Sequence, residues 1–397
     1  MNKDSIKEFI SKGISENVNE FIKMGFEGAV EEILKTVIES IMKAERTAYL
    51  SESENNKGNG YYERIVKYLE KYLRIKIPRD RNAEFKSELL EYLRKEKEKM
   101  DQLAFKLYVK GLTTRDIENV LKEVFDENYS ATQISLITQG FMKEKEEWLN
   151  KKLESSYYVL FIDAIQISVR RTTVEKESFY IVMGLRKDCK REILGVYNMP
   201  TESSEGWREV FKDLKNRGLE KVLLIVSDEI TSIQNVSKQE FKGVQHQFCI
   251  THKKRNLHLA VRASDKPKLE EDLKDLFKIG DARYTKEEAW IKFKAFKLKW
   301  KLYYPSVVNK LPDSKFDDYF AYLSFPYQIQ SMIYTTNWIE RLNKSIRKTE
   351  RNRNSMPSVD SAFSLLIAFI SEQENNYYLK YPVSSFFVVS ESLDSMF

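Results

Sequence analysis

The stretch SYYVLFIDAIQISVRR, residues 156–171, decides the fold that we expect for this chain. Residues 157–162 are continuously apolar, which is typical of a strand that is buried on both faces of a sheet. Asp163 ends this run. Acids are avoided inside buried strands, so we expect the strand to end at Asp163 and the carboxylate to stand at an edge of the sheet.

The segments that follow predict the rest of this sheet. Four more strands are expected, with one amphipathic helix before the fourth strand of the sheet: strands at 178–188, 191–200, 220–229 and 243–250, and a helix at 202–218. The first two of these strands are expected to be antiparallel neighbours joined by a turn at residues 188–191. The order predicts an α/β core with a mixed five-stranded sheet that starts near residue 155.

A second acid follows a buried strand, and a third lies on a basic helix. Asp228 comes directly after the apolar run of the strand at 220–229. Residues 334–354, YTTNWIERLNKSIRKTERNRN, form an amphipathic pattern whose apolar face holds Ile339, Leu342 and Ile346. The opposite face carries, at helical spacing, Glu340, Lys344, Arg347 and Arg351, with Lys348 beside them. A salt bridge from Glu340 to Lys344 is the simplest interpretation of the acid alone.

Taken together, the three acids predict a metal site. If the helix packs on the sheet, Asp163, Asp228 and Glu340 reach the same edge. Three carboxylates repel one another unless a cation lies between them, and Mg²⁺ or Mn²⁺ prefers such oxygen ligands. Two such ions can activate a water or a 3′-hydroxyl in a phosphoryl transfer. We therefore expect all three as catalytic metal ligands, and the basic residues Lys344, Arg347, Lys348 and Arg351 as contacts to a phosphate backbone.

The N-terminal part is expected to be mainly helical and to bind DNA. After residue 100, one helix ends at Gly111, a second is capped by Thr113 or Thr114, and a third is capped by Ser130. This pattern fits a helix-turn-helix, although a plain helical bundle is the open alternative. The candidates for reading base edges on the third helix are Thr132, Gln133, Ser135 and Gln139.

The residues before this region give weaker signals. Residues up to 49 have a helical period and form a candidate packing or self-association element. Asn59-Gly60 predicts a turn, and the alternation at residues 73–77 predicts a strand that stops at Pro78. Arg79 and Arg81 are candidates for phosphate contact, with a charged loop as the equal alternative.

Length and composition limit the class of protein. The 397 residues are enough for several domains: 1–99, 100–150 with the helix-turn-helix, a catalytic core of 151–252 and 331–375, an all-helical insertion at 253–330, and a tail at 376–397. The composition is globular, with 42% hydrophobic and 32% charged residues and a net charge of +6. Two cysteines suit a reducing cytoplasm, and the longest apolar run is too short for a membrane span.

The order of these motifs resembles the mutator-type bacterial transposases, the insertion-sequence 256 family. The resemblance covers residues from Arg46 to the end, and it rests on FIDAIQISVR, VLLIVSDE, FCITHKKRN and YTTNWIERLNKSIRK, with RIKIPRDRNAEF and LYVKGLTTRDIENVLKEVF upstream. It implies a ribonuclease-H-like core, a catalytic triad of Asp163, Asp228 and Glu340, and binding of terminal inverted repeats by the N-terminal part. Double-stranded DNA is then the partner, a homodimer is expected from the task of joining two ends, and neither a membrane nor a small-molecule substrate is involved.

Two features stand beside this resemblance. Cys249 and His252 have the spacing of half a zinc site, but the chain has too few other cysteines and histidines for a four-ligand site. The family carries such a pair here, so a local structural or DNA-positioning role is expected, with Lys253, Lys254 and Arg255 as phosphate contacts. Relatives usually have glycine after the second Asp, whereas this chain has Glu229, so a DNA-binding protein that has lost catalysis stays open beside another nuclease or integrase of the same fold.

Overall fold

The computed structural model describes residues 28, 30–51, 56–68, 71–125, 128–140, 142–199, 201–350, 353 and 355–397. The chain divides into two compact units, Met1–Gln139 and Gly140–Phe397. Among the residues that are described, no helix combines the length and the apolar character that crossing a bilayer requires. The earliest part of the expected N-terminal helical element, residues 1–27, lies outside the described residues.

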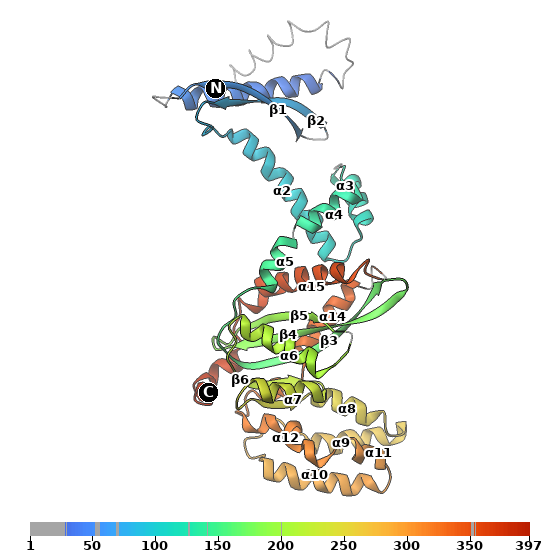
Figure 1. Cartoon of the computed structure of the whole chain (residues 1–397). Coiled ribbons are helices and arrows are strands. Elements are labelled where there is room, and N and C mark those ends of the chain that lie inside the picture. Colours follow the sequence, from blue (N-terminus) through green and yellow to red (C-terminus); the bar gives the residue numbers. More distant parts are fainter. Residues whose placement is uncertain are drawn as a thin grey trace. The chain divides into compact units, whose positions relative to one another are not determined.

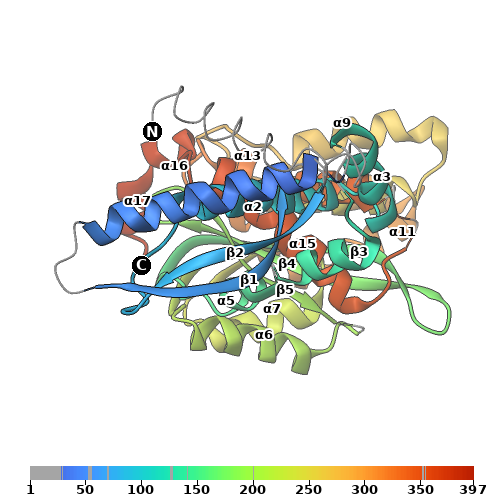
Figure 2. The same ribbon diagram turned by 90° about the horizontal axis from the view of Figure 1, so that it is seen from above.

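The first unit begins with a helix over residues 30–51 that packs on a two-stranded antiparallel sheet, β1 (Gly58–Tyr68) and β2 (Lys71–Asp80). Figure 2 shows this helix lying along the hairpin. The expected strand at 73–77 is confirmed: its alternating Leu73, Ile75 and Ile77 are buried against Ile38 and Met42. The strand does not stop at Pro78, which lies inside β2 and pairs with Tyr61 of β1.

The turn predicted at Asn59-Gly60 is wrong, because both residues belong to β1. Gly60 has a φ of +68°, and the register of the two strands shifts between Gly58 and Tyr61. A residue in the left-handed region at a register shift is typical of a β-bulge. Glycine therefore serves here as the irregular residue of a strand rather than as the tip of a hairpin.

Three helices follow in the same unit: α2 (Glu88–Val109), α3 (Thr114–Phe125) and α4 (Ala131–Gly140). They share a small core of Ala104, Ile117, Leu121 and Ile134. Gly111, with a φ of +99°, makes the turn after α2. Both expected caps are present as reciprocal pairs. The Thr113 hydroxyl accepts from Asp116 N–H at 3.2 Å, and Ser130 Oγ accepts from Gln133 N–H at 3.2 Å.

The second unit contains the predicted mixed five-stranded sheet. Its strands are β3 (Ser156–Arg170), β4 (Val174–Arg186), β5 (Arg191–Asn198), β6 (Lys221–Ser227) and β7 (Gln245–Phe248). The order in the sheet is β5-β4-β3-β6-β7, in which the first three strands are antiparallel and β3, β6 and β7 are parallel. The expected antiparallel pair of β4 and β5 is confirmed.

Helices cover both faces of this sheet (Figure 1). One face packs on α6 (Ser204–Asn216) and α7 (Thr231–Glu240), in a core that contains Trp207 and Phe211 together with Leu160 and Ile162 of β3. The other face packs on α14 (Asn337–Glu350) and α15 (Val359–Gln373). Because successive residues of a strand point to opposite faces, Phe161 meets α14, with its ring centroid 5.1 Å from that of Trp338.

The segment between β7 and α14 is helical, as predicted, and gathers beyond the β7 edge of the sheet (Figure 1). Its elements are α8 (Ile250–His258), η1 (Ala263–Asp265), α9 (Lys266–Leu276), α10 (Lys286–Lys301), α11 (Pro305–Asn309), η2 (Asp313–Lys315), α12 (Phe316–Tyr319), η3 (Ala321–Ser324) and α13 (Gln330–Ile333). Phe293, Phe296 and Trp300 of α10 are buried, as expected of core residues, whereas Trp290 is 38% exposed.

The flanks of the second unit pack on the sheet and its helices. α5 (Met142–Leu149) packs against α15, where the Trp148 indole N–H donates to Glu374 at 2.8 Å. The residues expected as a tail continue as a π-helical turn, η5 (Glu374–Tyr378), and as α16 (Ser384–Val388) and α17 (Ser390–Asp394). The Tyr158 hydroxyl of β3 donates to Asp394 at 3.1 Å, so these last helices belong to the folded body.

Candidate active site

The expectation that the first strand ends at Asp163 is wrong, because β3 continues to Arg170. After Asp163 the strand alternates, with Ile165, Ile167 and Val169 buried, and it stays paired with β4. The strand that ends near Asp163 is β6, the parallel neighbour of β3. Ile162 pairs with Ser227, the last residue of β6, so Asp163 and Asp228 are each one residue beyond the last paired position. The two carboxylates therefore do share an edge of the β3–β6 pair.

The third acid reaches the same edge on α14, which packs on β3. Ile339, Leu342 and Ile346 form its buried face, as the amphipathic pattern predicts. Burial, and then the charge of Asp228, raise the pKa of Asp163 to about 7, and Glu340 adds to this effect. We call Asp163, Asp228 and Glu340 the acid cluster.

His252, the third residue of α8, lies between two members of the acid cluster. Its Nδ1 contacts Asp228, and its Nε2 lies 3.0 Å from Glu340 Oε1. Interactions with Asp228 and Cys249 outweigh burial and raise the pKa of His252 to about 10. The imidazole is therefore a cation at neutral pH, and it stands between two carboxylates, where a cation is needed most. The sequence pattern alone gave His252 only a structural or positioning role.

Asn343 is a site residue that the sequence did not reveal. It is 2% exposed, and its side-chain amide donates to Asp163 Oδ2 at 3.1 Å and to the Ala164 carbonyl at 3.3 Å. The other carboxylate oxygen of Asp163 accepts from Ala164 N–H at 2.9 Å. Asn343 thus fixes the rotamer of Asp163 from the helix that carries Glu340. The sequence signal for this role is that Asn343 follows Glu340 by three residues, so that the two side chains are neighbours on the surface of the helix.

Cys249 holds the start of α14 against the end of β7. Its sulfur accepts from the N–H and the hydroxyl of Thr336, both at 3.4 Å, and lies 3.5 Å from the Thr335 hydroxyl. The carbonyl of Thr336 in turn accepts from Glu340 N–H at 3.0 Å. The thiol is 2% exposed. Cys249 therefore positions the first turn of the helix that presents Glu340.

The donor atoms at this edge fit a divalent cation. Asp228 Oδ1 and Glu340 Oε1 are both buried, and both face His252 without forming a well-aligned hydrogen bond. Carboxylate oxygens of this kind suit Mg²⁺ or Mn²⁺. A second donor set exists among the described residues, since one atom each of Asp228, Cys249 and His252 lie within 4.8 Å of one another. The sulfur of that set already accepts hydrogen bonds from Thr336, which favours the oxygen set.

Glu229 turns away from the acid cluster and toward the helical insertion. Its carboxylate forms an ion pair with Lys253 of α8 and another with Lys315 at 3.1 Å, and it accepts from the Tyr319 hydroxyl at 2.8 Å. Burial alone raises the pKa of Glu229, but these three partners together lower it below its usual range. We call Glu229, Lys253, Lys315 and Tyr319 the Glu229 cluster. The extra acid therefore neither adds to the acid cluster nor points to solvent.

The expected phosphate contacts near the acid cluster differ in exposure. Lys344, Arg347 and Lys348 are exposed on α14, whereas Arg351 lies outside the described residues. Lys253 is 5% exposed and bonded to Glu229 and to the Lys310 carbonyl, so its ammonium faces protein rather than solvent.

The two basic residues after Lys253 have different surroundings. Lys254 lies 3.6 Å from Glu270. Arg255 is 60% exposed and lies 4.0 Å from Glu340 Oε1, which places an exposed cation beside the acid cluster.

The candidates in the first unit are placed as follows. On α4, Thr132 is exposed and Ser135 is half-buried, while the side chain of Gln139 lies outside the described residues. Gln133 is exposed, but its amide oxygen accepts from Ser130 N–H at 2.8 Å and so belongs to the helix cap. Arg79 and Arg81 are both exposed on and just after β2. The guanidinium of Arg79 lies over the ring of Tyr62, 4.9 Å from its centroid.

The fold and the site together define a class: a mixed α/β protein with a half-buried acid cluster at the end of a parallel strand pair and a helical insertion before the third acid. Comparison with known proteins then identifies the family. The model of the family described as "Transposase, Mutator family" matches residues 7–379, and the chain belongs to this family.

Curated relatives agree with this assignment. The chain is 28% identical to the transposase for insertion sequence element IS905 of Lactococcus lactis subsp. lactis, over 85% of this chain and 87% of the relative. It is 28% identical to the transposase for IS1201 of Lactobacillus helveticus, over 86% and 92%. It is 29% identical to the transposase for IS256 in transposon Tn4001 of Staphylococcus aureus, over 86% and 89%. The resemblance seen in the sequence is confirmed, and the family implies an enzyme that processes DNA.

Proposed function

We propose that this chain cleaves the 3′ ends of its own insertion sequence and joins them to another DNA strand, with the acid cluster as its catalytic centre. The observation that carries the proposal is the meeting of Asp163, Asp228 and Glu340 at one edge of the sheet. The strand order β5-β4-β3-β6-β7, in which only β4 runs antiparallel to the other strands of the sheet, supports a ribonuclease-H-like core. The family assignment supports DNA as the substrate.

In this proposal the acid cluster holds Mg²⁺ or Mn²⁺, most simply as a pair of ions. When bound, such ions activate a water or a 3′-hydroxyl and stabilise the leaving oxygen of an in-line phosphoryl transfer. The protein's own groups set the geometry: Asn343 fixes the carboxylate of Asp163, and His252 spaces Asp228 from Glu340. No side chain forms a covalent bond to DNA, so no serine or tyrosine nucleophile is required.

The remaining residues bind and orient DNA in this proposal. Exposed Lys344, Arg347 and Lys348 on α14, with Arg255 on α8, hold the phosphates on either side of the scissile bond. The α2–α4 helices of the first unit bind the terminal inverted repeats as a helix-turn-helix, with Thr132 and Ser135 nearest to the bases. Both ends of the element must be processed together, so we expect a homodimer.

The alternative of a DNA-binding protein that has lost catalysis rested on Glu229. The commitment of the Glu229 carboxylate to Lys253, Lys315 and Tyr319, rather than to the acid cluster, supports the catalytic proposal over this alternative.

The test is cleavage of a labelled duplex that carries one end of the element, with purified full-length protein and Mg²⁺. We expect the wild type to nick the 3′ end, and Asp163→Asn, Asp228→Asn and Glu340→Gln to bind the duplex without cutting it. Glu205→Gln is the matched control, because Glu205 is an exposed acid on α6 with 72% of its side chain in solvent. Cutting in the presence of EDTA, or cutting by the three variants, contradicts the proposal.

A further inference from the structure

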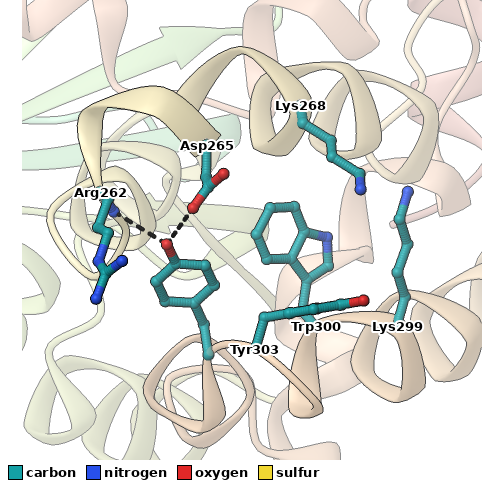
Figure 3. A pocket seen from close by; sticks show the side chains of 7 residues that line it. Arg262, Asp265, Lys268, Lys299, Trp300 and Tyr303 are labelled. Atoms are coloured by element: carbon teal, nitrogen blue, oxygen red, sulfur yellow. Dashed lines mark hydrogen bonds between the residues drawn. The ribbon is translucent and has the colours of Figure 1, made fainter.

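The helical insertion carries a hollow of about 420 Å³ on its own surface, between the end of α8 and the helices α9 and α10. Its lining combines basic and aromatic side chains: Arg262, Asp265, Lys268, Lys299, Trp300, Tyr303 and Tyr304 (Figure 3). Its volume lies in the range of sites that bind small organic groups. None of these residues belongs to the acid cluster or to the Glu229 cluster.

The charge of the lining favours an anion. Arg262, Lys268 and Lys299 of the lining are balanced by the carboxylate of Asp265 and by Asp272, which pairs with Lys299, so an excess of one positive charge remains. Within the described part of the chain, neither Arg262 nor Lys268 forms an ion pair, and both are exposed. In Figure 3 the ammonium groups of Lys268 and Lys299 extend toward one another from α9 and α10. Among the described residues the Lys268 ammonium has no ion-pair partner, while the Lys299 ammonium beside it pairs with Asp272, and a phosphate can add to this pair of cations.

The aromatic side chains supply a flat surface beside these cations. Tyr303 is 73% exposed, which is unusual for so large a ring, while Trp300 is 3% exposed. The indole N–H of Trp300 donates to Asp272 at 2.8 Å, and Lys299 forms an ion pair with the same carboxylate at 2.7 Å. These contacts fix the floor of the hollow and leave the Tyr303 ring at its mouth. An exposed ring next to cations is the arrangement that proteins use to stack a nucleobase and hold its phosphate.

We propose that this hollow binds one nucleotide of single-stranded DNA, with the base stacked on Tyr303 and the phosphate held by Lys268 and Lys299. This inference rests on the proposed function and deepens it by naming a strand contact outside the catalytic centre. A single strand is favoured over a duplex because paired bases expose their edges and not the faces that a ring stacks on.

The path of α8 places this site within reach of a strand that enters the acid cluster. His252 lies near the start of α8 and touches Asp228, and the chain reaches Arg262 four residues after the helix ends. From His252 to His258 an α-helix rises about 9 Å, and phosphates along one strand are about 3.4 Å apart along the axis. The rise of α8 corresponds to the length of about three nucleotides, so we expect a single strand released at the acid cluster to be able to reach the hollow.

The test measures binding of fluorescein-labelled oligothymidine by full-length protein in EDTA, so that no cleavage occurs. Tyr303→Ala is expected to weaken this binding about tenfold through the loss of base stacking, whereas Tyr303→Phe keeps the ring and the affinity. Lys268→Ala is expected to lower the slope of log affinity against log salt by about 0.7, the value for one phosphate of a single strand. Affinity for a blunt duplex is expected to stay unchanged in both variants.

Leu302→Ala is the matched control, because Leu302 is adjacent to Tyr303 and 82% exposed but does not line the hollow. Equal oligothymidine affinity in Tyr303→Ala and wild type overturns the inference, and so does binding of thymidine monophosphate as tight as that of the oligomer, which would indicate a free nucleotide as the ligand. Cleavage of the duplex end with Mg²⁺ is measured in parallel. If the wild type cuts the duplex and Tyr303→Ala binds the oligomer normally, nucleotide binding in the hollow is refuted and the proposed function stands. If the wild type does not cut and Tyr303→Ala binds the oligomer more weakly, the proposed function alone is refuted.

Discussion

Asp228 and Glu229 are neighbours in the chain, yet they belong to two regions with opposite electrostatics. In the acid cluster, three carboxylates face the imidazole of His252, with only the exposed Arg255 near Glu340 as a further cation among the described residues. In the Glu229 cluster, one carboxylate meets two ammonium groups and a phenol hydroxyl. The first region lacks positive charge and so can accept cations from outside, whereas the second is complete within the protein. Side-chain type alone does not decide whether an acid serves chemistry or structure; its surroundings do.

The largest expected difference between the two acids is in cleavage. Asp228→Asn removes a proposed metal ligand and is expected to slow nicking of the element end about a thousandfold, as loss of several kcal/mol of charge stabilisation requires. Glu229→Gln keeps the shape of the side chain and is expected to leave the rate within a few fold. Single-turnover nicking with saturating protein measures both. A Glu229→Gln variant as slow as Asp228→Asn would erase the distinction between the two regions.

The next expected effect is on stability, where the substitution of Glu229 is expected to cost more than the substitution of Asp228. Glu229→Gln leaves the ammonium of Lys253, which is 5% exposed, without its carboxylate and is expected to cost about 3 kcal/mol of unfolding free energy. The double variant Glu229→Gln with Lys253→Met removes that buried charge and is expected to recover most of the loss. Urea unfolding of the four proteins of this cycle measures the coupling. Additive losses in the double variant would show that the pair is not coupled.

A third prediction concerns a buried histidine that is linked to Asp228 through Ser227. His246 on β7 is 2% exposed, its Nε2 lies 3.1 Å from Ser227 Oγ, and that hydroxyl donates to the Asp228 carbonyl. Burial lowers the pKa of His246 from 6.5 to about 3. Between these two values the unfolded chain binds a proton that the folded chain does not, so stability falls as the pH falls below 6.5.

From about pH 7 to about pH 5 this group is expected to cost roughly 2 kcal/mol of stability. The measurement is urea unfolding at both pH values for wild type and His246→Gln, in which the other titrating groups are shared. The variant is expected to lose less stability than wild type over this interval. An equal loss in both proteins would mean that His246 titrates normally in the fold.

The smallest expected effect separates two lysines. Lys344 is exposed on α14, so Lys344→Ala is expected to lower the salt slope of duplex binding by about 1, the value for one phosphate contact. Lys253 is committed to Glu229, so Lys253→Met is expected to leave the slope unchanged. Fluorescence anisotropy across a salt series measures both. A change of slope in Lys253→Met would mean that the Glu229 cluster opens to bind DNA.

The sequence predicted the sheet and its helices well because their patterns are local. The five strands, the helix with Trp207 inside and the amphipathic face of Ile339, Leu342 and Ile346 all follow from periodicity within one segment. The end of the first strand was misplaced because Asp163 interrupts only the apolar run of β3, at the point where the neighbouring strand β6 ends. The end of β6 is a property of a distant segment.

The parts of the site that the sequence missed depend on contacts between segments far apart in the chain. Asn343 matters only because α14 lies across β3, and Lys253 is unavailable to phosphate only because Glu229 reaches it from the end of β6. Gln133 differs, since its use in the helix cap of Ser130 is a local pattern that could have been recognised. The placement of Asp163, Asp228 and Glu340 at one edge agrees with the prediction, while their catalytic role stays a prediction.

The ion pair of Glu229 and Lys253 also constrains how this chain can evolve. A mutation that replaces Glu229 leaves the buried ammonium of Lys253 without a carboxylate. A mutation that replaces Lys253 leaves Glu229 with Lys315 and Tyr319 alone. The first step is the costlier one, because Lys253 is the more deeply enclosed partner. A lineage is therefore expected to lose the lysine before the acid, or to supply the lysine with a new partner, so that positions 229 and 253 vary together among its descendants.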